Sequence, residues 1–292
     1  MHKSGFINII GNPNVGKSTL MNCLVGEKLS IITSKAQTTR HRIIGIVNGD
    51  EFQLIFSDTP GIVKPSYELQ NSMMDFVKSA LDDADIILYM LEIGEKSIKD
   101  LSVHNKILNA KVPTLILLNK IDLSNQEDLE QEVNKWSAQY PNSEIFPISA
   151  LNNFNIENLI NRIIELIPES PPYFPKDQLT DKPERFFVNE KLREKILMYY
   201  DKEIPYSVEI VTDEFKEEKN IIKIRSQILV ERESQKGIII GHKGSALKKI
   251  GTKARLDLEK FFDKKVFIDL HVKVSKNWRS NTKLLKKFGY KS

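Results

Sequence analysis

The sequence predicts two domains, a larger α/β domain followed by a small α+β domain. Short apolar runs alternate with helical patterns over residues 1–168, which is typical of a mainly parallel sheet with helices on both faces. Five prolines then occur among polar residues between positions 168 and 183, so residues 169–184 are predicted to form a linker. Residues 185–292 have a different pattern and a strong excess of basic charge.

The first domain is expected to begin with a strand at residues 6–10, a glycine-rich loop and a helix that starts near Lys17. Residues 34–42 are polar without a hydrophobic period and are predicted to be loop. Strand patterns at 43–47 and 52–56 are separated by Asn48-Gly49-Asp50-Glu51, which favours an antiparallel hairpin. The remaining elements alternate between helix and strand: helix 69–81, strand 86–91, helix 98–108, strand 114–118, helix 129–140, strand 145–148 and helix 156–167.

The second domain is predicted to mix helices and strands without regular alternation. The expected elements are a helix at 188–200, strands at 206–212 and 221–230, a basic helix at 245–262 and a strand at 266–274. Residues 281–292 are basic and are expected to form one helix, with Leu284, Leu285 and Phe288 on its apolar side.

The composition, 40% hydrophobic and 28% charged, is typical of an ordinary soluble protein. The longest apolar runs, 86–91 and 114–118, are far shorter than the ~20 residues that span a bilayer, and no signal peptide is predicted. The single cysteine, Cys23, excludes an internal disulfide and a cysteine-based zinc site, and is expected to pack as a small residue on the helix after the loop. These features favour the cytosol.

The net charge of +4 is unevenly distributed. Residues 236–292 hold 16 basic and 4 acidic side chains, whereas residues 1–235 hold 27 basic and 35 acidic ones. A basic C-terminal fifth on an acidic body favours nucleic-acid binding or, more weakly, contact with an anionic membrane surface. A merely solvated basic face is the alternative.

The glycine-rich loop has the GxxxxGK[S/T] spacing of a phosphate-binding loop. In this pattern backbone N–H groups surround phosphate oxygens, Lys17 reaches the outer phosphates and the Ser18 hydroxyl holds Mg²⁺. An ordinary turn between strand and helix is the alternative. The predicted nucleotide-binding residues of this loop are Gly11, Asn12, Pro13, Asn14, Val15, Gly16, Lys17, Ser18 and Thr19.

A phosphate loop alone is compatible with a kinase, an ATPase or a GTPase, and the sequence NKID at 119–122 favours guanine. The carboxylate of Asp122 can accept two hydrogen bonds from the N1–H and N2–H₂ edge of guanine, which adenine does not offer. Lys120 can cover the purine ring, and Asn119 can tie this loop to the phosphate loop. The predicted base-binding residues are Asn119, Lys120, Ile121, Asp122, Ser149 and Ala150, the last two through backbone N–H groups near guanine O6.

Residues 1–170 resemble the translation-factor-like GTPases, because GNPNVGKS, a TTR loop, DTPG, NKID and SAL occur in that family's order and spacing. The resemblance implies that Ser18 and Thr39 ligate Mg²⁺, with Thr38 as the rival ligand, and that Asp58 holds the ion through water. It also implies that the Gly61 N–H senses the γ-phosphate. The nucleotide-binding residues that it adds are Asp58, Thr59, Pro60, Gly61 and Ile62.

Catalysis is expected to be slow. Many relatives place a glutamine just after the DTPG-like motif to orient the attacking water, whereas this chain has Ile62. Asn14 resembles the residue with which one GTPase branch holds K⁺ beside the phosphates; a plain turn asparagine is the alternative. The predicted catalytic residues are Lys17, Thr39, Gly61 and, through a monovalent cation, Asn14.

In the second domain, Gly241-His242-Lys243-Gly244 follows an apolar run and precedes a lysine-rich helix that includes Lys248 and Lys249. A GxxG loop at such a helix allows close approach of a nucleic-acid backbone, as in KH domains, which clamp about four nucleotides. GxxG alone is weak, and its context supports the assignment. With five histidines and no cluster, His242 is expected to contact RNA or solvent rather than a metal.

The whole chain resembles the Era family, bacterial GTPases with a C-terminal type II KH domain, most specifically over residues 230–255. The resemblance implies GTP and GDP binding, binding of 16S rRNA near its 3′ end, a role in 30S ribosomal subunit assembly and a monomeric cytoplasmic protein. Peripheral contact with the inner membrane surface is compatible with it. An RNA-binding scaffold of negligible turnover and a P-loop kinase or ATPase are the rival hypotheses.

Overall fold

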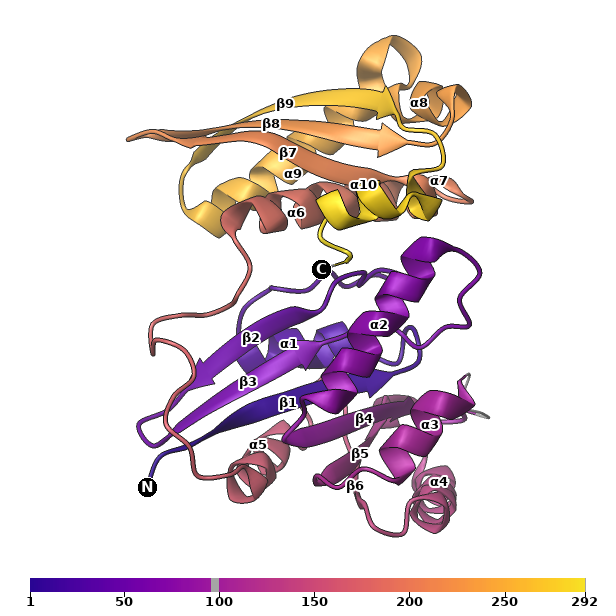
Figure 1. Cartoon of the computed structure of the whole chain (residues 1–292), viewed down its shortest axis with the longest axis vertical. Coiled ribbons are helices and arrows are strands. Elements are labelled where there is room, and N and C mark those ends of the chain that lie inside the picture. Colours follow the sequence, from indigo (N-terminus) through magenta and orange to yellow (C-terminus); the bar gives the residue numbers. More distant parts are fainter. Residues whose placement is uncertain (96–99, 292) are drawn as a thin grey trace. The chain divides into compact units, whose positions relative to one another are not determined.

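The chain is described here by a computed structural model over residues 1–95 and 100–291 (Figure 1). It separates into two compact units. The first comprises Met1–Ser66 and Gln70–Asp181, and the second comprises Tyr67–Leu69 and the residues from Lys182 onward.

The N-terminal unit is built on a six-stranded sheet with the order β2-β3-β1-β4-β5-β6, in which only β2 runs antiparallel to its neighbour. The strands are β1 Lys3–Gly11, β2 Ile43–Asn48, β3 Phe52–Asp58, β4 Ile86–Glu92, β5 Thr114–Asn119 and β6 Glu144–Pro147. The helices are α1 Lys17–Val25, α2 Glu68–Asp82, α3 Leu101–Leu108, the 3₁₀ turn Ile121–Leu123, α4 Gln126–Gln139 and α5 Ile156–Leu166.

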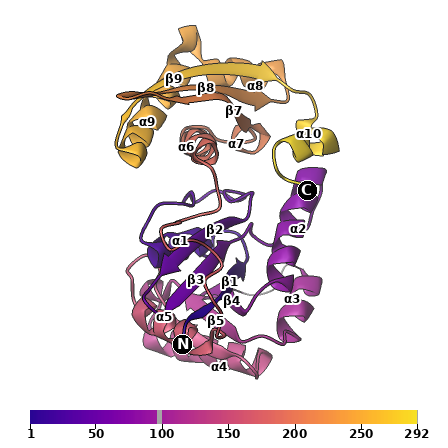
Figure 2. The same ribbon diagram turned by 60° about the vertical axis from the view of Figure 1, so that its left-hand side comes forward.

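Helices cover both faces of this sheet, as the alternating pattern predicts. Side chains of α2, α3 and α4 form one apolar cluster with Tyr89 and Ile116 of the central strands. Helices α1 and α5 lie on the opposite face (Figure 2). Strands β4 and β5 are apolar along nearly their whole length because both of their faces are buried.

The predicted hairpin is confirmed as β2 and β3. The predicted helix 98–108 is observed from Leu101, and Ile98 lies outside the described residues. The proline-rich segment up to Asp181 is part of the N-terminal unit and runs along the edge strand β2. The N–H of Ile46 donates to the Leu179 carbonyl at 2.8 Å, so this segment pairs with backbone groups that an edge strand otherwise exposes.

The C-terminal unit is built on a three-stranded sheet with the order β7-β8-β9. Its strands are β7 Glu209–Glu217, β8 Ile221–Val230 and β9 Lys265–Val274, with β7 antiparallel and β9 parallel to β8. Its helical elements are α6 Glu184–Tyr199, α7 Ile204–Ser207, α8 Glu233–Ile240, α9 Ser245–Phe262, α10 Thr282–Lys287 and the 3₁₀ turns His242–Gly244 and Trp278–Ser280.

The core of this unit lies between the sheet and helices α6 and α9 (Figure 2). Every second residue of β8 faces it, including Ile222, Ile224 and Ile228. Leu192 of α6 and Ala254 of α9 pack against them. The alternating pattern of 221–230 and the apolar stripes of the two helices therefore account for this layered α+β arrangement.

Two expectations for this unit need correction, and one helix was not predicted. Tyr206 belongs to the helical turn α7, which starts beside Pro205, and the strand begins only at Glu209. The apolar run before the GxxG loop forms the end of helix α8, although Gly237 and three isoleucines are poor helix formers, because Ile239 is fully buried in the core.

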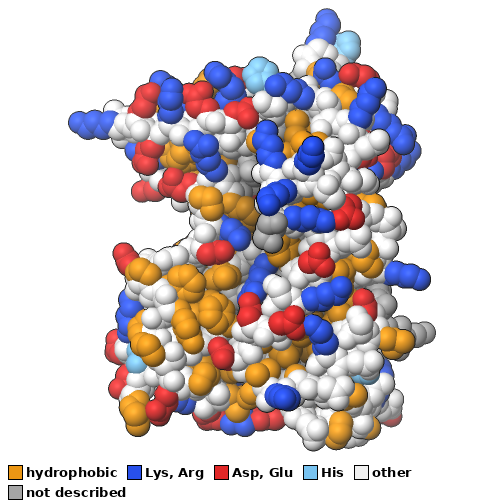
Figure 3. Space-filling model, in the orientation of Figure 1, with side chains coloured by type: hydrophobic (Ala, Val, Ile, Leu, Met, Phe, Trp, Pro, Cys, Tyr) orange, Lys and Arg blue, Asp and Glu red, His pale blue; other side chains and the backbone are white. Residues whose placement is uncertain are grey.

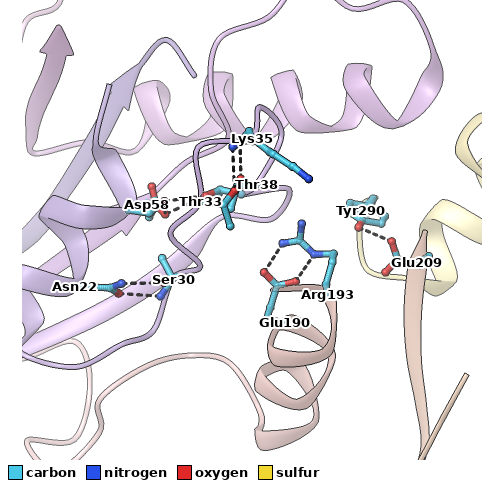
Figure 4. Close-up of polar contacts among 12 residues, drawn as sticks. Asn22, Ser30, Thr33, Lys35, Thr38, Asp58, Glu190, Arg193, Glu209 and Tyr290 are labelled. Atoms are coloured by element: carbon cyan, nitrogen blue, oxygen red, sulfur yellow. Dashed lines mark hydrogen bonds and ion pairs between the residues drawn. The ribbon is translucent and has the colours of Figure 1, made fainter. Parts of the chain in front are cut away.

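The last predicted helix is shorter than expected and ends at Lys287. Beyond it, the Tyr290 hydroxyl donates a 2.7 Å hydrogen bond to Glu209 at the start of β7 (Figure 4). The buried Trp278 indole donates to the Ser207 carbonyl at 2.9 Å. The C-terminal segment is therefore folded into the unit by Leu285 and Phe288 of the predicted apolar stripe together with Trp278 and Tyr290 outside it.

In the part of the chain that the structure describes, no helix is both long enough and apolar enough to cross a membrane.

Candidate nucleotide site and nucleic-acid surface

Loops at the carboxyl ends of β1, β5 and β6 surround a cavity of about 350 Å³ in the N-terminal unit. Ligands of open α/β sheets bind at this edge. The predicted residues that line the cavity are Pro13, Asn14, Gly16, Lys17, Ser18, Thr19, Thr39, Gly61, Asn119, Lys120, Asp122 and Ser149. The predicted residues outside its lining are Gly11, Asn12, Val15, Asp58, Thr59, Pro60, Ile62, Ile121 and Ala150.

Gly16 ends the phosphate loop and begins α1 in a left-handed conformation, with φ 105° and ψ 15°. A Cβ at this position would lie 2.3 Å from Nδ2 of Asn119. Both the conformation and the close approach require glycine. The resulting turn leaves the first N–H groups of α1 directed at the cavity, as in phosphate sites at helix N-termini.

The side chain of Lys17 is buried against the phosphate loop that precedes it. Its ammonium donates to the carbonyls of Gly11 at 3.1 Å and Asn12 at 2.7 Å. Burial lowers its pKa to about 8, against the opposing effect of the nearby Asp58 and Glu95 carboxylates. The side chain is therefore held at the cavity wall as a desolvated cation at neutral pH.

Ser18, Thr39 and Asp58 form a cluster of oxygen atoms beside Lys17. The Ser18 hydroxyl donates to Asp58 Oδ2 at 2.7 Å and lies 2.9 Å from the Thr39 hydroxyl, which is 3.3 Å from the same carboxylate oxygen. Burial raises the pKa of Asp58, and the hydrogen bond from Ser18 and the charge of Lys17 oppose that shift.

The structure separates the two candidate threonines. The Thr38 hydroxyl lies 2.7 Å from the Thr33 hydroxyl and donates to the Lys35 carbonyl at 2.6 Å (Figure 4). Thr39 is the threonine that meets Ser18 and Asp58.

This cluster fits a magnesium ion. Hydroxyl and carboxylate oxygens are the hard ligands that Mg²⁺ prefers. The second oxygen of Asp58, Oδ1, is buried and has no hydrogen-bond partner among residues 1–95 and 100–291. A cation or its hydration water would satisfy this atom.

Asn119 ties its loop to the phosphate loop, as predicted, and also to the loop after β6. Its Nδ2 donates to the Val15 carbonyl at 2.7 Å, and its Oδ1 accepts from the Ala150 N–H at 2.9 Å. The base-binding loop, the phosphate loop and the loop after β6 are therefore held in one arrangement.

The groups predicted to bind the base are themselves positioned by side chains. The Ser149 hydroxyl donates to Oδ1 of Asp122 at 2.5 Å, which fixes the carboxylate. Lys120 has φ 67° and its ammonium pairs with Glu92 at the end of β4. The interaction with Glu92 was not predicted, because no motif links these two positions.

Ile62 is fully buried in the apolar cluster of the unit, and its N–H donates to the Gly11 carbonyl at 3.1 Å. Its side chain is therefore a core residue and does not reach the cavity. Asn14 is exposed with φ 67°, and its Nδ2 donates to the Ser34 carbonyl at 2.9 Å.

Several cavity residues were not predicted: Ile31, Ile32, Thr33, Gln37 and Leu123. Residues 31–37 lie in a loop with no motif, so only folding brings them to the cavity. Leu123 directly follows Asp122 and is 78% exposed. An apolar residue next to the polar NKID motif was the one sequence feature that could have indicated its place at the cavity.

Cys23 is only half-buried, contrary to the expectation of a packed residue. Its thiol donates to Asn153 Oδ1 at 2.8 Å, and partial burial raises its pKa. It faces a shallow groove on the N-terminal unit.

The GxxG loop joins α8 to α9 in the C-terminal unit. Gly241 has φ 71° and ψ 179°, a conformation essentially reserved for glycine, and Gly244 begins α9 with φ 77° and ψ 7°. Between them His242 and Lys243 are exposed. The backbone of this loop is therefore accessible from solvent.

Exposed lysines continue from this loop along α9, at Lys248, Lys249 and Lys253. Many Lys and Arg side chains are visible on this unit, interspersed with acidic ones (Figure 3). Among the described residues no group of three His, Cys, Asp or Glu side chains is arranged to hold a metal.

One family match falls in each unit. Residues 6–120 match the family described as 50S ribosome-binding GTPase, and residues 203–279 match the KH domain family. The chain is 47% identical to GTPase Era of Geotalea uraniireducens over 99% of this chain and 98% of that protein. It is 46% identical to GTPase Era of Clostridium kluyveri over 100% of both.

Two solved structures extend this similarity to the whole fold. A crystal structure of Era in complex with MgGDPNP and nucleotides 1506–1542 of 16S ribosomal RNA matches with a TM-score of 0.95 and 39% identity, covering 100% of both chains. A variant of Aquifex aeolicus Era bound to GDP·AlF₄⁻ matches with the same TM-score and identity, covering 99% of this chain and 100% of that chain. The chain therefore belongs to the Era family, GTPases that join a P-loop domain to a KH domain.

Proposed function

We propose that this protein is a slow GTP-hydrolysing switch that binds 16S rRNA near its 3′ end and assists assembly of the 30S ribosomal subunit. The observation that carries the proposal is the single cavity in which the phosphate loop, the Ser18 and Thr39 hydroxyls and the Asp122 carboxylate converge. The proposed domains are 1–168 for the GTPase, 169–184 for the linker and 185–292 for the KH domain with its basic tail.

Guanine recognition rests on the fixed Asp122 carboxylate. Its Oδ1 accepts from Ser149, which orients the group for the two donors of a guanine edge. We place the base between the Lys120 stem and the apolar residues at the cavity mouth. ATP lacks the matching donors, so its base would not satisfy the Asp122 carboxylate as the guanine edge does.

The triphosphate is expected to lie on the phosphate loop and on the N-terminus of α1. Lys17, already desolvated, would donate to phosphate oxygens in place of the Gly11 and Asn12 carbonyls. Ser18 and Thr39 would hold Mg²⁺ with Asp58 behind them; the bound ion neutralises charge on the phosphates.

Slow turnover is expected because the residue that follows the DTPG motif is an isoleucine. Ile62 is in the core and offers no polar group to orient water. We propose that K⁺ held near Asn14 supplies part of the missing charge stabilisation, and that RNA or the 30S subunit supplies the rest. Replacing K⁺ by Na⁺ should then lower the rate, and an unchanged rate would remove the cation from the proposal.

The KH unit supports rRNA as the partner, since its glycine loop is open and the following helix is basic. The related Era structure was solved with nucleotides 1506–1542 of 16S ribosomal RNA, which is the RNA proposed here. We further propose a cytoplasmic monomer, with peripheral contact of the basic unit with the inner membrane surface as a secondary property.

The decisive experiment measures GTP and ATP hydrolysis alone, with rRNA and with 30S subunits. Stimulated GTP hydrolysis supports the switch, whereas a negligible rate that neither RNA nor subunits raise supports the alternative, an RNA-binding scaffold. The burial of Ile62 is the observation that favours this alternative. Asp122→Asn should shift the preference toward xanthine nucleotides, and competition of ATP with GTP would instead indicate a kinase or ATPase.

A further inference from the structure

An exposed tyrosine ring lies beside the GxxG loop and has no role in the proposed function so far. Tyr199 is the last residue of α6, and 39% of its surface is exposed. The next residue, Tyr200, packs on the core and donates its hydroxyl to the Ile239 carbonyl at 2.9 Å. Since Ile239 lies two residues before Gly241, this bond holds the end of α6 next to the loop.

The other side of the loop contacts the same ring. Lys249 lies in the second turn of α9, and its ammonium is 4.5 Å from the centroid of the Tyr199 ring. At a rise of about 1.5 Å per residue, Lys249 is only about 7.5 Å along the helix from Gly244. Tyr199 is therefore positioned from both ends of the GxxG loop, by Tyr200 and by Lys249.

An exposed aromatic face next to ammonium groups matches the chemistry of single-stranded nucleic acid. Each base presents a π-face that stacks on an aromatic ring, while the neighbouring phosphate attracts lysine. Lys249 currently covers the ring through a cation–π contact. A phosphate is a stronger partner for the ammonium, so RNA would draw Lys249 away and expose the ring to a base.

The surrounding charges give the bound strand an orientation. Lys248 and Lys249 are exposed on the α9 side, whereas Asp201, Lys202 and Glu203 are exposed just after the ring on the α6 side and together carry one net negative charge. Phosphates would be repelled from the acidic side and attracted to the basic side.

We propose that Tyr199 is a stacking platform for one RNA base adjacent to the nucleotides clamped by Gly241–Gly244, with its phosphates on Lys248 and Lys249. This proposal rests on RNA binding by the KH unit and adds a subsite to it. Stacking is tolerant of base identity, so the subsite contributes affinity and register rather than sequence specificity.

The test uses the full chain with a GTP analogue and a single-stranded RNA of the 16S 3′-end sequence. Tyr199→Leu keeps the apolar bulk but removes the ring, and should weaken binding about tenfold without changing the salt dependence. Tyr199→Phe, the matched control, should bind within about twofold of the wild type because the ring remains.

Abasic substitutions along the RNA locate the stacked base. The wild type should lose affinity at one position beside the clamped nucleotides, and Tyr199→Leu should be insensitive at that same position. Tyr199→Trp adds a direct readout, because stacking should quench the introduced fluorophore, whereas Trp136 and Trp278 are buried.

The outcomes separate this inference from the function on which it rests. Equal RNA affinity of Tyr199→Leu and wild type overturns the stacking subsite, even if changing Gly241 and Gly244 to Asp abolishes binding as expected. Normal RNA binding by that glycine variant, or no binding by the wild type, overturns the KH assignment and the subsite together.

Discussion

The phosphate loop and the GxxG loop each end on a left-handed glycine that begins a helix, yet their surroundings differ. At Gly16 an added Cβ would lie 2.3 Å from the Asn119 amide, whereas at Gly244 nothing lies within 4 Å. The lysine after Gly16 is buried, and the lysine before Gly244 is exposed.

The difference reflects the two kinds of ligand. A nucleotide is small and must be enclosed with every donor in place, so neighbouring loops close around Gly16. A polynucleotide passes across the surface, so Gly244 only has to bring backbone close to it. One glycine is thus required by packing and conformation together, and the other by conformation alone.

The largest effect is expected from removing the buried ammonium group of Lys17. Lys17→Ala should weaken GTP binding about 1000-fold, because two charge-assisted hydrogen bonds to phosphate are lost. Titration with a fluorescent GTP analogue measures this. RNA binding measured without nucleotide is the control and should be the same for the variant and the wild type; near-normal GTP affinity would contradict the placement of Lys17 at the phosphates.

The second prediction compares the glycines directly. Gly16→Ala should weaken nucleotide binding about 100-fold, since the left-handed strain adds to displacement of Asn119. Gly244→Ala meets no neighbouring atom and should weaken RNA binding only about fivefold through strain alone. Calorimetry for both ligands checks this, and equal losses would show that the two loops are equally enclosed.

The third prediction concerns pH. Burial lowers the pKa of Lys17 to about 8, and phosphate binding requires the ammonium form. Nucleotide affinity should therefore be nearly constant below pH 8 and fall about tenfold per pH unit above it. GDP dissociation constants from pH 6.5 to 9.5 measure this. Guanosine, which lacks phosphates, controls for titration of the base, and the same decline with guanosine would exclude Lys17 as its cause.

The smallest effect is expected from removing one exposed lysine beside the GxxG loop. Lys248→Ala should weaken RNA binding about threefold and lower the slope of log affinity against log salt by about one. Filter binding at several salt concentrations tests this. Lys216→Ala, at an exposed lysine of β7 outside the predicted surface, is the matched control, and an equal effect there would show that only overall charge matters.

Much of the fold was predictable because each domain has strong local periodicity. The alternation of apolar runs predicted the mainly parallel sheet, and the spacing around Asn48-Gly49 predicted the β2–β3 hairpin. Prediction failed where tertiary burial outweighs local preference. Helix α8 contains Gly237 and β-branched residues, and Tyr206 precedes a strand but turns with Pro205.

The candidate site was likewise predictable only in part. The motifs placed Lys17 and Asp122 at one edge of the sheet, and the structure brings both to one cavity. The neighbouring threonines could not be separated by sequence, because the loop before β2 has no period to set its register. Glu92, which pairs with Lys120, had no motif at all.

The sequence by itself determined the class of ligand for each half of the protein. Glycine, lysine and hydroxyl spacing specifies short-range backbone geometry, and that geometry is sufficient to indicate phosphate, guanine and RNA. Only the tertiary structure decided that Thr39 meets Ser18 and Asp58, and that Tyr199 meets Lys249. These contacts join segments far apart in the chain, so they depend on how the cores pack rather than on any local pattern.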